Sequence, residues 1–325
     1  MSENTMLRKN EILGLLRTLG NRIPYQNLSN PDVLKDLSST PRDINIIIGV
    51  RGREAFLPIC IRYLKKAIEK SPLTTRITIV EQDISPKFRD ICKGVDIDYV
   101  FIPNSFIVSG KAYNRSLCFN AGYILANLST WYLFHDIDIL VDPEFFVKLK
   151  TYLDKNPQWI QTYTKKRVLL LKSGITDTII KHTACIDFSV LQNERDYSPA
   201  TAGSTGGSIL VRSDIFTKVG GFDPELFYGY GPEDSFFWSK LECLDKRVDQ
   251  VYNHFAGGGV FADDPAIEVY HLYHSSMSQS NPDERVMLGL RQYFWSLKYN
   301  EKMDIINEKE KIFLESVSLL KTSSR

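Results

Sequence analysis

Two pairs of carboxylates and one pair of histidines have the spacing to do chemistry. Asp136 and Asp138 lie two positions apart in an apolar segment, 131–140, that we predict to be a strand. Because side chains alternate along a strand, both carboxylates are expected on one side of it. Two carboxylates at a strand end form half of a site for a hard divalent cation, which can bridge a protein to a diphosphate. The alternative is that they only keep the strand end soluble.

His271 and His274 are three positions apart in the segment EVYHLYHSS, 268–276. Imidazole is a common ligand of transition metals, and with carboxylate and phosphate oxygens it would complete an octahedral Mn²⁺ shell. A histidine pair at this spacing is also common as a structural or surface feature.

Glu233 and Asp234 follow a loop, YGYG, in which Tyr228 and Tyr230 alternate with glycines. Aromatic faces stack on sugar rings, while carboxylates accept hydrogen bonds from hydroxyls, and glycines allow such a loop to close over a substrate. We predict a helix over 233–244. Compensation of its dipole is the simpler reason for acidic residues at its start.

Guanidinium groups occur twice where a phosphate could bind. Arg51 and Arg53 surround a glycine directly after an apolar segment, and Asn114 with Arg115 opens a predicted helix over 111–126. Arginine binds phosphates and base edges with paired hydrogen bonds. A solvated loop is the alternative for the first pair.

The elements that must position these residues alternate along the chain. Segments 43–50, 75–80 and 95–102 are predicted strands, and 54–70 is a predicted helix. This alternation is typical of an α/β fold with a doubly wound sheet, whose ligands lie beyond the carboxyl ends of the strands. The pair Gly206–Gly207 precedes a further strand, 208–212, and allows the backbone to approach a ligand.

We predict three parts: an N-terminal helical extension (1–42), a catalytic domain (43–280, with halves 43–142 and 143–280) and C-terminal helices (281–325). The C-terminal helices are expected either to pack on the core or to contact a membrane surface or a partner subunit. Packing on the core is the favoured alternative.

Composition excludes several classes of protein. The chain has 325 residues, with 40 Lys and Arg against 39 Asp and Glu and a net charge of +1, so no strong overall field attracts nucleic acid. The five cysteines are scattered without a CxxC pair, which indicates reduced thiols. The first residues are polar where a signal peptide needs an unbroken apolar stretch, and no apolar run approaches about 18 residues, so we expect neither a signal peptide nor a membrane span. We therefore expect a cytoplasmic protein, with peripheral membrane contact as a variant of that location.

In order and chemistry, the segments resemble the β-1,4-galactosyltransferase family, inverting glycosyltransferases of the GT-A (nucleotide-diphospho-sugar transferase) fold. The resemblance covers about 45–276 and rests on these segments: IIIGVRGR, Tyr113-Asn114-Arg115, HDIDIL, Gly207, Gly221-Phe222-Asp223, YGYGPEDS and His274. It implies an α/β architecture with a mixed, mostly parallel sheet flanked by helices. It also implies Mn²⁺ as cofactor and a UDP-sugar as donor.

The resemblance implies roles for single residues. Asp138 and His274 would bind the metal, and His271 stands where the family commonly has methionine, so it becomes a third ligand. Asp136 would lie toward the nucleotide. The remaining donor contacts would be Arg51, Arg53, Asn114, Arg115 and Gly207.

On the acceptor side, Asp234 matches the catalytic base and Glu233 the carboxylate that binds acceptor hydroxyls. Tyr228 and Tyr230 replace family tryptophans, and Pro232 replaces a glycine. Ser204 leaves space near the donor 2-position, which hints at an N-acetylated sugar. The expected acceptor is a glycan or a lipid-linked sugar.

Two other functions are weighed. A retaining transferase of the polypeptide N-acetylgalactosaminyltransferase type shares the aspartate pair, but commonly has Glu-Asn where this chain has Glu233-Asp234. A non-catalytic sugar-nucleotide-binding protein would need none of the candidate catalytic groups. The sequence favours an inverting, metal-dependent transferase that moves a hexose or an N-acetylhexosamine.

Overall fold

The computed structural model describes residues 24–30, 32–38, 40–93, 97–104, 113–126, 129–163, 168–182, 185–186, 195–196, 206–227, 229, 231–244, 259–261, 267–274 and 284–323. The amphipathic helix expected around residues 12–19 lies outside these ranges, as do Ser204, Tyr228 and Tyr230. Within them, no helix has the length and apolar character needed to cross a bilayer.

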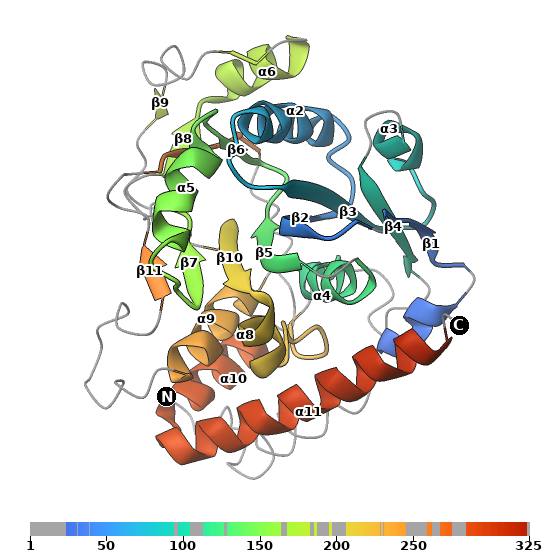
Figure 1. Cartoon of the computed structure of the whole chain (residues 1–325), viewed down its shortest axis with the longest axis vertical. Helices are drawn as coiled ribbons and strands as arrows, with labels where there is room; N and C mark the ends of the chain where they lie inside the picture. Colours follow the sequence, from blue (N-terminus) through green and yellow to red (C-terminus); the bar gives the residue numbers. More distant parts are fainter. Residues whose placement is uncertain are drawn as a thin grey trace.

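A mixed sheet of eight strands forms the centre of the molecule (Figure 1). Four neighbouring strands, β4, β3, β2 and β5, run parallel, whereas β10 lies antiparallel between β5 and β7. In spatial order the strands are β1 (Leu34–Asp36), β4 (Asp98–Pro103), β3 (Thr75–Asp83), β2 (Arg42–Val50), β5 (Ser129–His135), β10 (Ser208–Arg212), β7 (Trp159–Gln161) and β11 (Gly259–Phe261). The predicted α/β class with a mostly parallel sheet is confirmed.

A smaller second sheet carries part of the candidate site. Its order is β6 (Ile139–Val141), β12 (Val269–His271), β8 (Val168–Leu171) and β9 (Arg195–Asp196). Strand β12 pairs antiparallel with β6, and this register places His271 opposite Ile139. The late histidine segment is thereby fixed beside the residue that follows Asp138.

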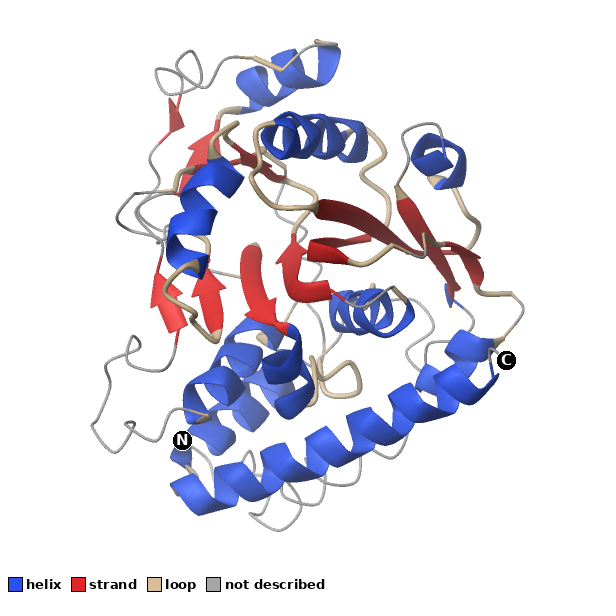
Figure 2. Cartoon of the chain, viewed as in Figure 1, coloured by secondary structure: helices blue, strands red, loops and turns tan. Residues whose placement is uncertain are grey.

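Helices cover both faces of the main sheet (Figure 2). One hydrophobic cluster joins the sheet to α2 (Phe56–Glu69), α3 (Arg89–Lys93), α5 (Phe145–Leu153) and α6 (Ser173–Lys181). Another joins it to α4 (Arg115–Leu125), α8 (Ser213–Lys218), α9 (Glu233–Cys243) and the long helix α11 (Tyr299–Ser323). On β2 the side chains alternate accordingly, with Ile46 and Ile48 in the first cluster and Ile47 in the second.

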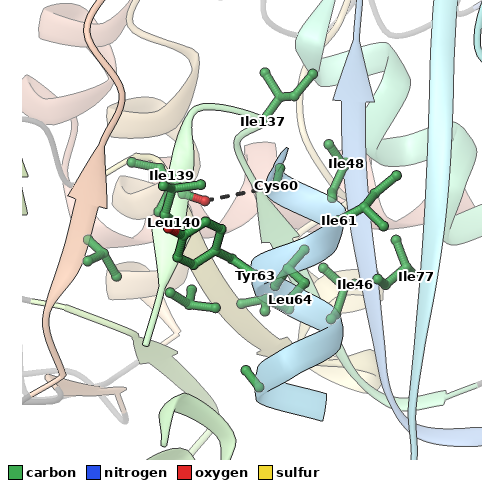
Figure 3. Close-up of a cluster of buried hydrophobic side chains, with 14 of the residues drawn as sticks. Ile46, Ile48, Cys60, Ile61, Tyr63, Leu64, Ile77, Ile137, Ile139 and Leu140 are labelled. Carbon is green, nitrogen blue, oxygen red and sulfur yellow. Dashed lines mark hydrogen bonds between the residues drawn. The ribbon is translucent and has the colours of Figure 1, made fainter. Parts of the chain in front are cut away.

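Figure 3 shows the first cluster around α2, where Ile46, Ile48 and Leu64 fill the space between helix and sheet. The Cys60 thiol reaches the carbonyl oxygen of Ile139 at 3.9 Å. All five cysteines are free thiols, which confirms the sequence prediction. Burial raises the pKa of Cys60 well above its ordinary value, so this thiol is unreactive and contributes to the structure through its packing.

The described residues before and after the segment 43–280 are attached to the core. Strand β1, which lies in the predicted N-terminal helical extension, pairs with β4 at the edge of the main sheet, and a short 3₁₀ helix, η3 (Pro24–Ser29), precedes it. The C-terminal segment forms α10 (Glu284–Ser296) and α11, and buried side chains on α11 include Ile305, Ile306 and Phe313. This face of α11 therefore packs on the core.

Candidate metal and transfer site

The turn between β5 and β6 presents the two aspartates. The chain leaves β5 at His135, turns through 136–138 and enters β6 at Ile139, so the prediction of one strand over 131–140 is wrong. His135 closes the turn, with Nδ1 2.9 Å from Ser208 Oγ and Nε2 3.0 Å from the Ile139 carbonyl. Because the backbone turns here, period-two alternation does not apply, and Asp136 and Asp138 contact different partners.

Asp138 converges with both histidines. One ligand atom from each of Asp138, His271 and His274 lies within 4.8 Å of the others. His274 Nε2 is 3.2 Å from Asp138 Oδ2, and His271 Nε2 is 3.9 Å from Oδ1. Backbone hydrogen bonding supports the arrangement, since Leu272 N donates to the Asp138 carbonyl at 2.8 Å.

The donor set fits a divalent transition metal. His271 Nδ1 lies 2.8 Å from the Leu272 carbonyl, which only accepts, so Nδ1 carries a proton, and Nε2 is the nitrogen that faces Asp138 and would bind a metal. Burial alone would raise the pKa of Asp138, but the hydrogen bond to His274 and the charges of His271 and Arg53 hold it well below its ordinary value. An ionised carboxylate with two imidazoles suits Mn²⁺ or a similar ion.

Arg53 lies at the same cluster. Its guanidinium donates to Asp138 Oδ2 through Nη1, and Nη2 is 3.4 Å from His274 Nε2. The turn that carries it is left-handed at two successive residues, with φ 63° at Gly52 and 55° at Arg53. Arg51, in the same turn, is half-buried. The predicted phosphate-binding turn thus lies beside the candidate metal site.

Asn114 and Arg115 begin α4 in different ways. The Asn114 side chain accepts from Leu117 N at 2.9 Å as the helix cap and donates to the Pro224 carbonyl at 2.8 Å, so both of its polar atoms are engaged within the protein. Arg115 Nε donates to Asp136 Oδ1 at 2.7 Å. Burial raises the pKa of Asp136 to about 6, although the Arg115 charge acts against this shift.

Glu233 and Asp234 begin α9 next to the glycine pair. A Cβ atom on Gly206 would lie 1.8 Å from Asp234 Oδ2, so the backbone approaches this carboxylate closely. Burial, together with the neighbouring Asp234, raises the pKa of Glu233 to about 8. Near neutral pH the protonated form of Glu233 is therefore favoured.

Two contributors, His135 and Tyr163, were not assigned from the sequence, and a third, Gly206, was predicted only as part of the glycine pair. His135 could have been found from its position directly before the aspartates. Gly206 adjoins the predicted Gly207, but its closeness to Asp234 depends on tertiary structure. Tyr163 has no sequence signal, yet its hydroxyl accepts from Gly207 N at 2.9 Å and fixes the glycine pair.

Comparison with known proteins adds a set of distant structures. No protein-family model and no curated protein sequence matches the chain. A variant of Drosophila β-1,4-galactosyltransferase 7, solved with manganese, UDP-Gal and xylobiose, is 14% identical with a TM-score of 0.38, over 61% of this chain and 60% of that chain.

Two bacterial structures are also similar. Mycobacterium tuberculosis glucosyl-3-phosphoglycerate synthase, with Mn²⁺, UDP-glucose and phosphoglyceric acid, is 12% identical with a TM-score of 0.44, over 86% of this chain and 83% of that chain. Staphylococcus aureus TarS is 12% identical with a TM-score of 0.47, over 84% and 71%. At such identities and scores, the function of this chain must be argued from its own site.

Proposed function

We propose that this protein is a metal-dependent, inverting glycosyltransferase that moves a hexose or an N-acetylhexosamine from a UDP-sugar to a glycan or lipid-linked sugar. The observation that carries the proposal is the convergence of Asp138, His271 and His274, from distant parts of the chain, at the end of β5. The order of the sequence motifs, which resembles the β-1,4-galactosyltransferase family, supports the same function.

The divalent cation, held by Asp138, His271 and His274, would neutralise charge on the departing diphosphate. Arg53 and Arg51 lie in the turn beside it and are proposed to bind the donor phosphates. The protein's other contribution is the adjacent side chains of Glu233 and Asp234, and burial raises the pKa of Glu233 to about 8. Glu233, when protonated, can donate a hydrogen bond to an acceptor hydroxyl.

Asp234 is proposed as the general base. It takes the proton of the acceptor hydroxyl while that oxygen forms a bond to the anomeric carbon and the bond to the UDP oxygen breaks. Attack from the face opposite UDP inverts the configuration. A positioned base contributes about 10²- to 10⁴-fold to such a step. Free thiols in the described chain favour a reducing compartment as the place of action.

The test begins with donor binding. Wild-type protein is titrated with UDP-sugars in the presence and absence of Mn²⁺, and the donor that raises the melting temperature only with Mn²⁺ is offered to candidate acceptors. Asp138→Asn should lose Mn²⁺-dependent donor binding at least tenfold. Asp154→Asn, which removes an exposed carboxylate paired with Lys150, is the matched control and should bind as wild type.

The configuration of the product distinguishes the candidate functions. NMR of the newly formed linkage reads the anomer directly. An inverted product supports the proposal, whereas a retained one favours the retaining class. Donor binding without transfer to any acceptor, and without hydrolysis, would indicate a non-catalytic sugar-nucleotide-binding protein.

A further inference from the structure

Arg115 is the residue at which the two halves of the candidate site meet. It is the first residue of α4, and its side chain is 13% exposed. The guanidinium lies over the ring of Phe119, one helical turn further on, with 4.7 Å between Cζ and the ring centroid. Packing on this ring fixes the plane of the guanidinium and hence the directions of its N–H groups.

Every nitrogen of this guanidinium faces a different segment of the site. Nε donates to Asp136 Oδ1 at 2.7 Å, in the turn that also carries Asp138. Nη2 donates to the Gly206 carbonyl at 2.5 Å, and Nη1 lies 3.4 Å from Glu233 Oε1. A lysine has one nitrogen and no fixed fork, so it could not hold three segments at once.

The contact with Gly206 reaches the proposed base. Gly206 is in close contact with Asp234, since a Cβ there would lie 1.8 Å from Oδ2. A shift of the Gly206 carbonyl would therefore move the backbone against which the Asp234 carboxylate rests. Through Gly206 on one side and Glu233 on the other, Arg115 borders both proposed acceptor-side groups.

Charge provides a second reason for an arginine here. Three carboxylates, Asp136, Glu233 and Asp234, act on the buried guanidinium, and the charges of Asp136 and Asp234 raise the pKa of Glu233. The Arg115 charge opposes this effect at Glu233. Without it, the carboxylates would repel one another or take up further protons.

We propose that Arg115 is a positioning residue of the transfer reaction, which ties the Asp136 turn, the Gly206 carbonyl and Glu233 together and so sets the place of the Asp234 carboxylate. This inference rests on the proposed function. It assigns Arg115 a different task from the donor contact that the family resemblance implies, because its N–H groups are directed at protein oxygens.

The experiment compares Arg115→Lys and Arg115→Gln with wild type, using the donor and acceptor found above. Both variants should bind UDP and Mn²⁺ within about threefold of wild type by calorimetry. Both should lose kcat by about 10²-fold, the loss that a misplacement of about 1 Å can cause. The donor KM should change little.

The pH profile separates positioning from a merely structural effect. Glu233 is proposed to act in its protonated form, and the Arg115 charge lowers the pKa of Glu233. Arg115→Gln should therefore move the descending limb of kcat to higher pH, whereas Arg115→Lys should leave it near the wild-type position. Partial unfolding would lower kcat without moving the limb.

Arg89→Lys is the matched control, because Arg89 makes a paired contact with Asp36 at the far edge of the sheet and should change none of these values. If neither Arg115 variant folds, Phe119→Leu tests the same link, because it removes the ring that fixes the guanidinium plane, with kcat lost and UDP binding retained as the expected result.

The outcomes distinguish the inference from the proposed function. A wild-type chain that transfers no sugar overturns the proposed function. If the wild type is active and the Arg115 variants keep both kcat and the position of the pH limb, the inference alone is overturned. The same holds if the variants lose UDP binding but keep kcat. Retained kcat in Phe119→Leu has the same meaning.

Discussion

At the scale of single residues, Arg53 and a metal ion would compete for one carboxylate oxygen. The Arg53 guanidinium contacts Asp138 Oδ2, the oxygen that lies 3.2 Å from His274 Nε2. Because two cations at one oxygen repel, we expect Arg53→Gln to tighten Mn²⁺ binding several-fold in the absence of nucleotide. Gln must adopt the same positive φ as Arg53, so backbone strain is matched.

Mn²⁺ titration followed by electron paramagnetic resonance measures this effect directly. Arg53→Lys keeps the positive charge and serves as the comparison, with binding near the wild-type value. Weaker Mn²⁺ binding by the Gln variant would show that Arg53 supports the metal site instead of competing for it.

Glu233 makes stability depend on pH. Its pKa is raised by burial to about 8 in the folded chain, above the ordinary value of 4.5. Between these values the folded state binds more protons than the unfolded state, so stability falls as pH rises. Each unit of such a shift corresponds to about 1.4 kcal/mol. Glu233→Gln cannot ionise and should lose less stability than wild type between pH 5.5 and pH 8, measured by thermal unfolding. Equal losses in both proteins would contradict the burial of this carboxyl.

At the scale of secondary-structure elements, the sequence predicts those helices and strands that have a strong local pattern of residues. The β-branched run in β2, the strand 208–212 and the helix from Glu233 are found within a few residues of their predicted bounds, because each has a strong period or a clear start. The short strands β8 and β12 depend on pairing across the chain, which local periodicity does not encode.

The candidate site was likewise predicted only in part. The types and order of its residues could be predicted from the sequence, since carboxylates and histidines are uncommon beside apolar strands. The different partners of Asp136 and Asp138 could not be, because the β5–β6 turn is fixed by hydrogen bonds to Gly207, just before β10, and to Leu272, just after β12. The contacts of Arg115 likewise join three segments that only the fold brings together.

Helix α4 also fixes the turn before α9. Asn120 accepts from Phe222 N and donates to the Phe222 carbonyl, both at 2.9 Å and both buried. Asn120→Ala would leave these two backbone groups unpaired, at ~1–3 kcal/mol each. Urea unfolding should therefore show a loss of about 2 to 6 kcal/mol for the two groups together. Asn307→Ala, which changes an exposed asparagine on α11, should alter stability by less than about 0.5 kcal/mol. A loss below 1 kcal/mol at Asn120 would mean that the turn repairs its own hydrogen bonds.

At the scale of the whole molecule, α11 is the long helix that runs along one side of the fold in Figure 1 and is joined to it by buried charges. Lys309 Nζ pairs with Asp223 and lies 3.1 Å from Glu225 Oε1, while Lys240 Nζ on α9 is 2.6 Å from Asp223 Oδ2. The turn that holds these carboxylates also rests on the α11 backbone, because a Cβ on Gly220 would lie 2.7 Å from the carbonyl carbon of Lys309.

Removal of one member of such a buried network leaves its partners desolvated and unpaired. Lys309→Met should therefore lower the free energy of unfolding by about 3 to 5 kcal/mol. Lys218→Met is the matched control, because Lys218 pairs with Glu310 of α11 at the surface, where an ion pair contributes at most about 1 kcal/mol. Urea unfolding of both variants measures the difference. If the two losses are equal, apolar contacts such as those of Phe313 hold α11 in place. If only Lys309→Met is strongly destabilised, α11 is held through the segment that leads into Glu233 and Asp234. The C-terminal helix is then part of what positions the site.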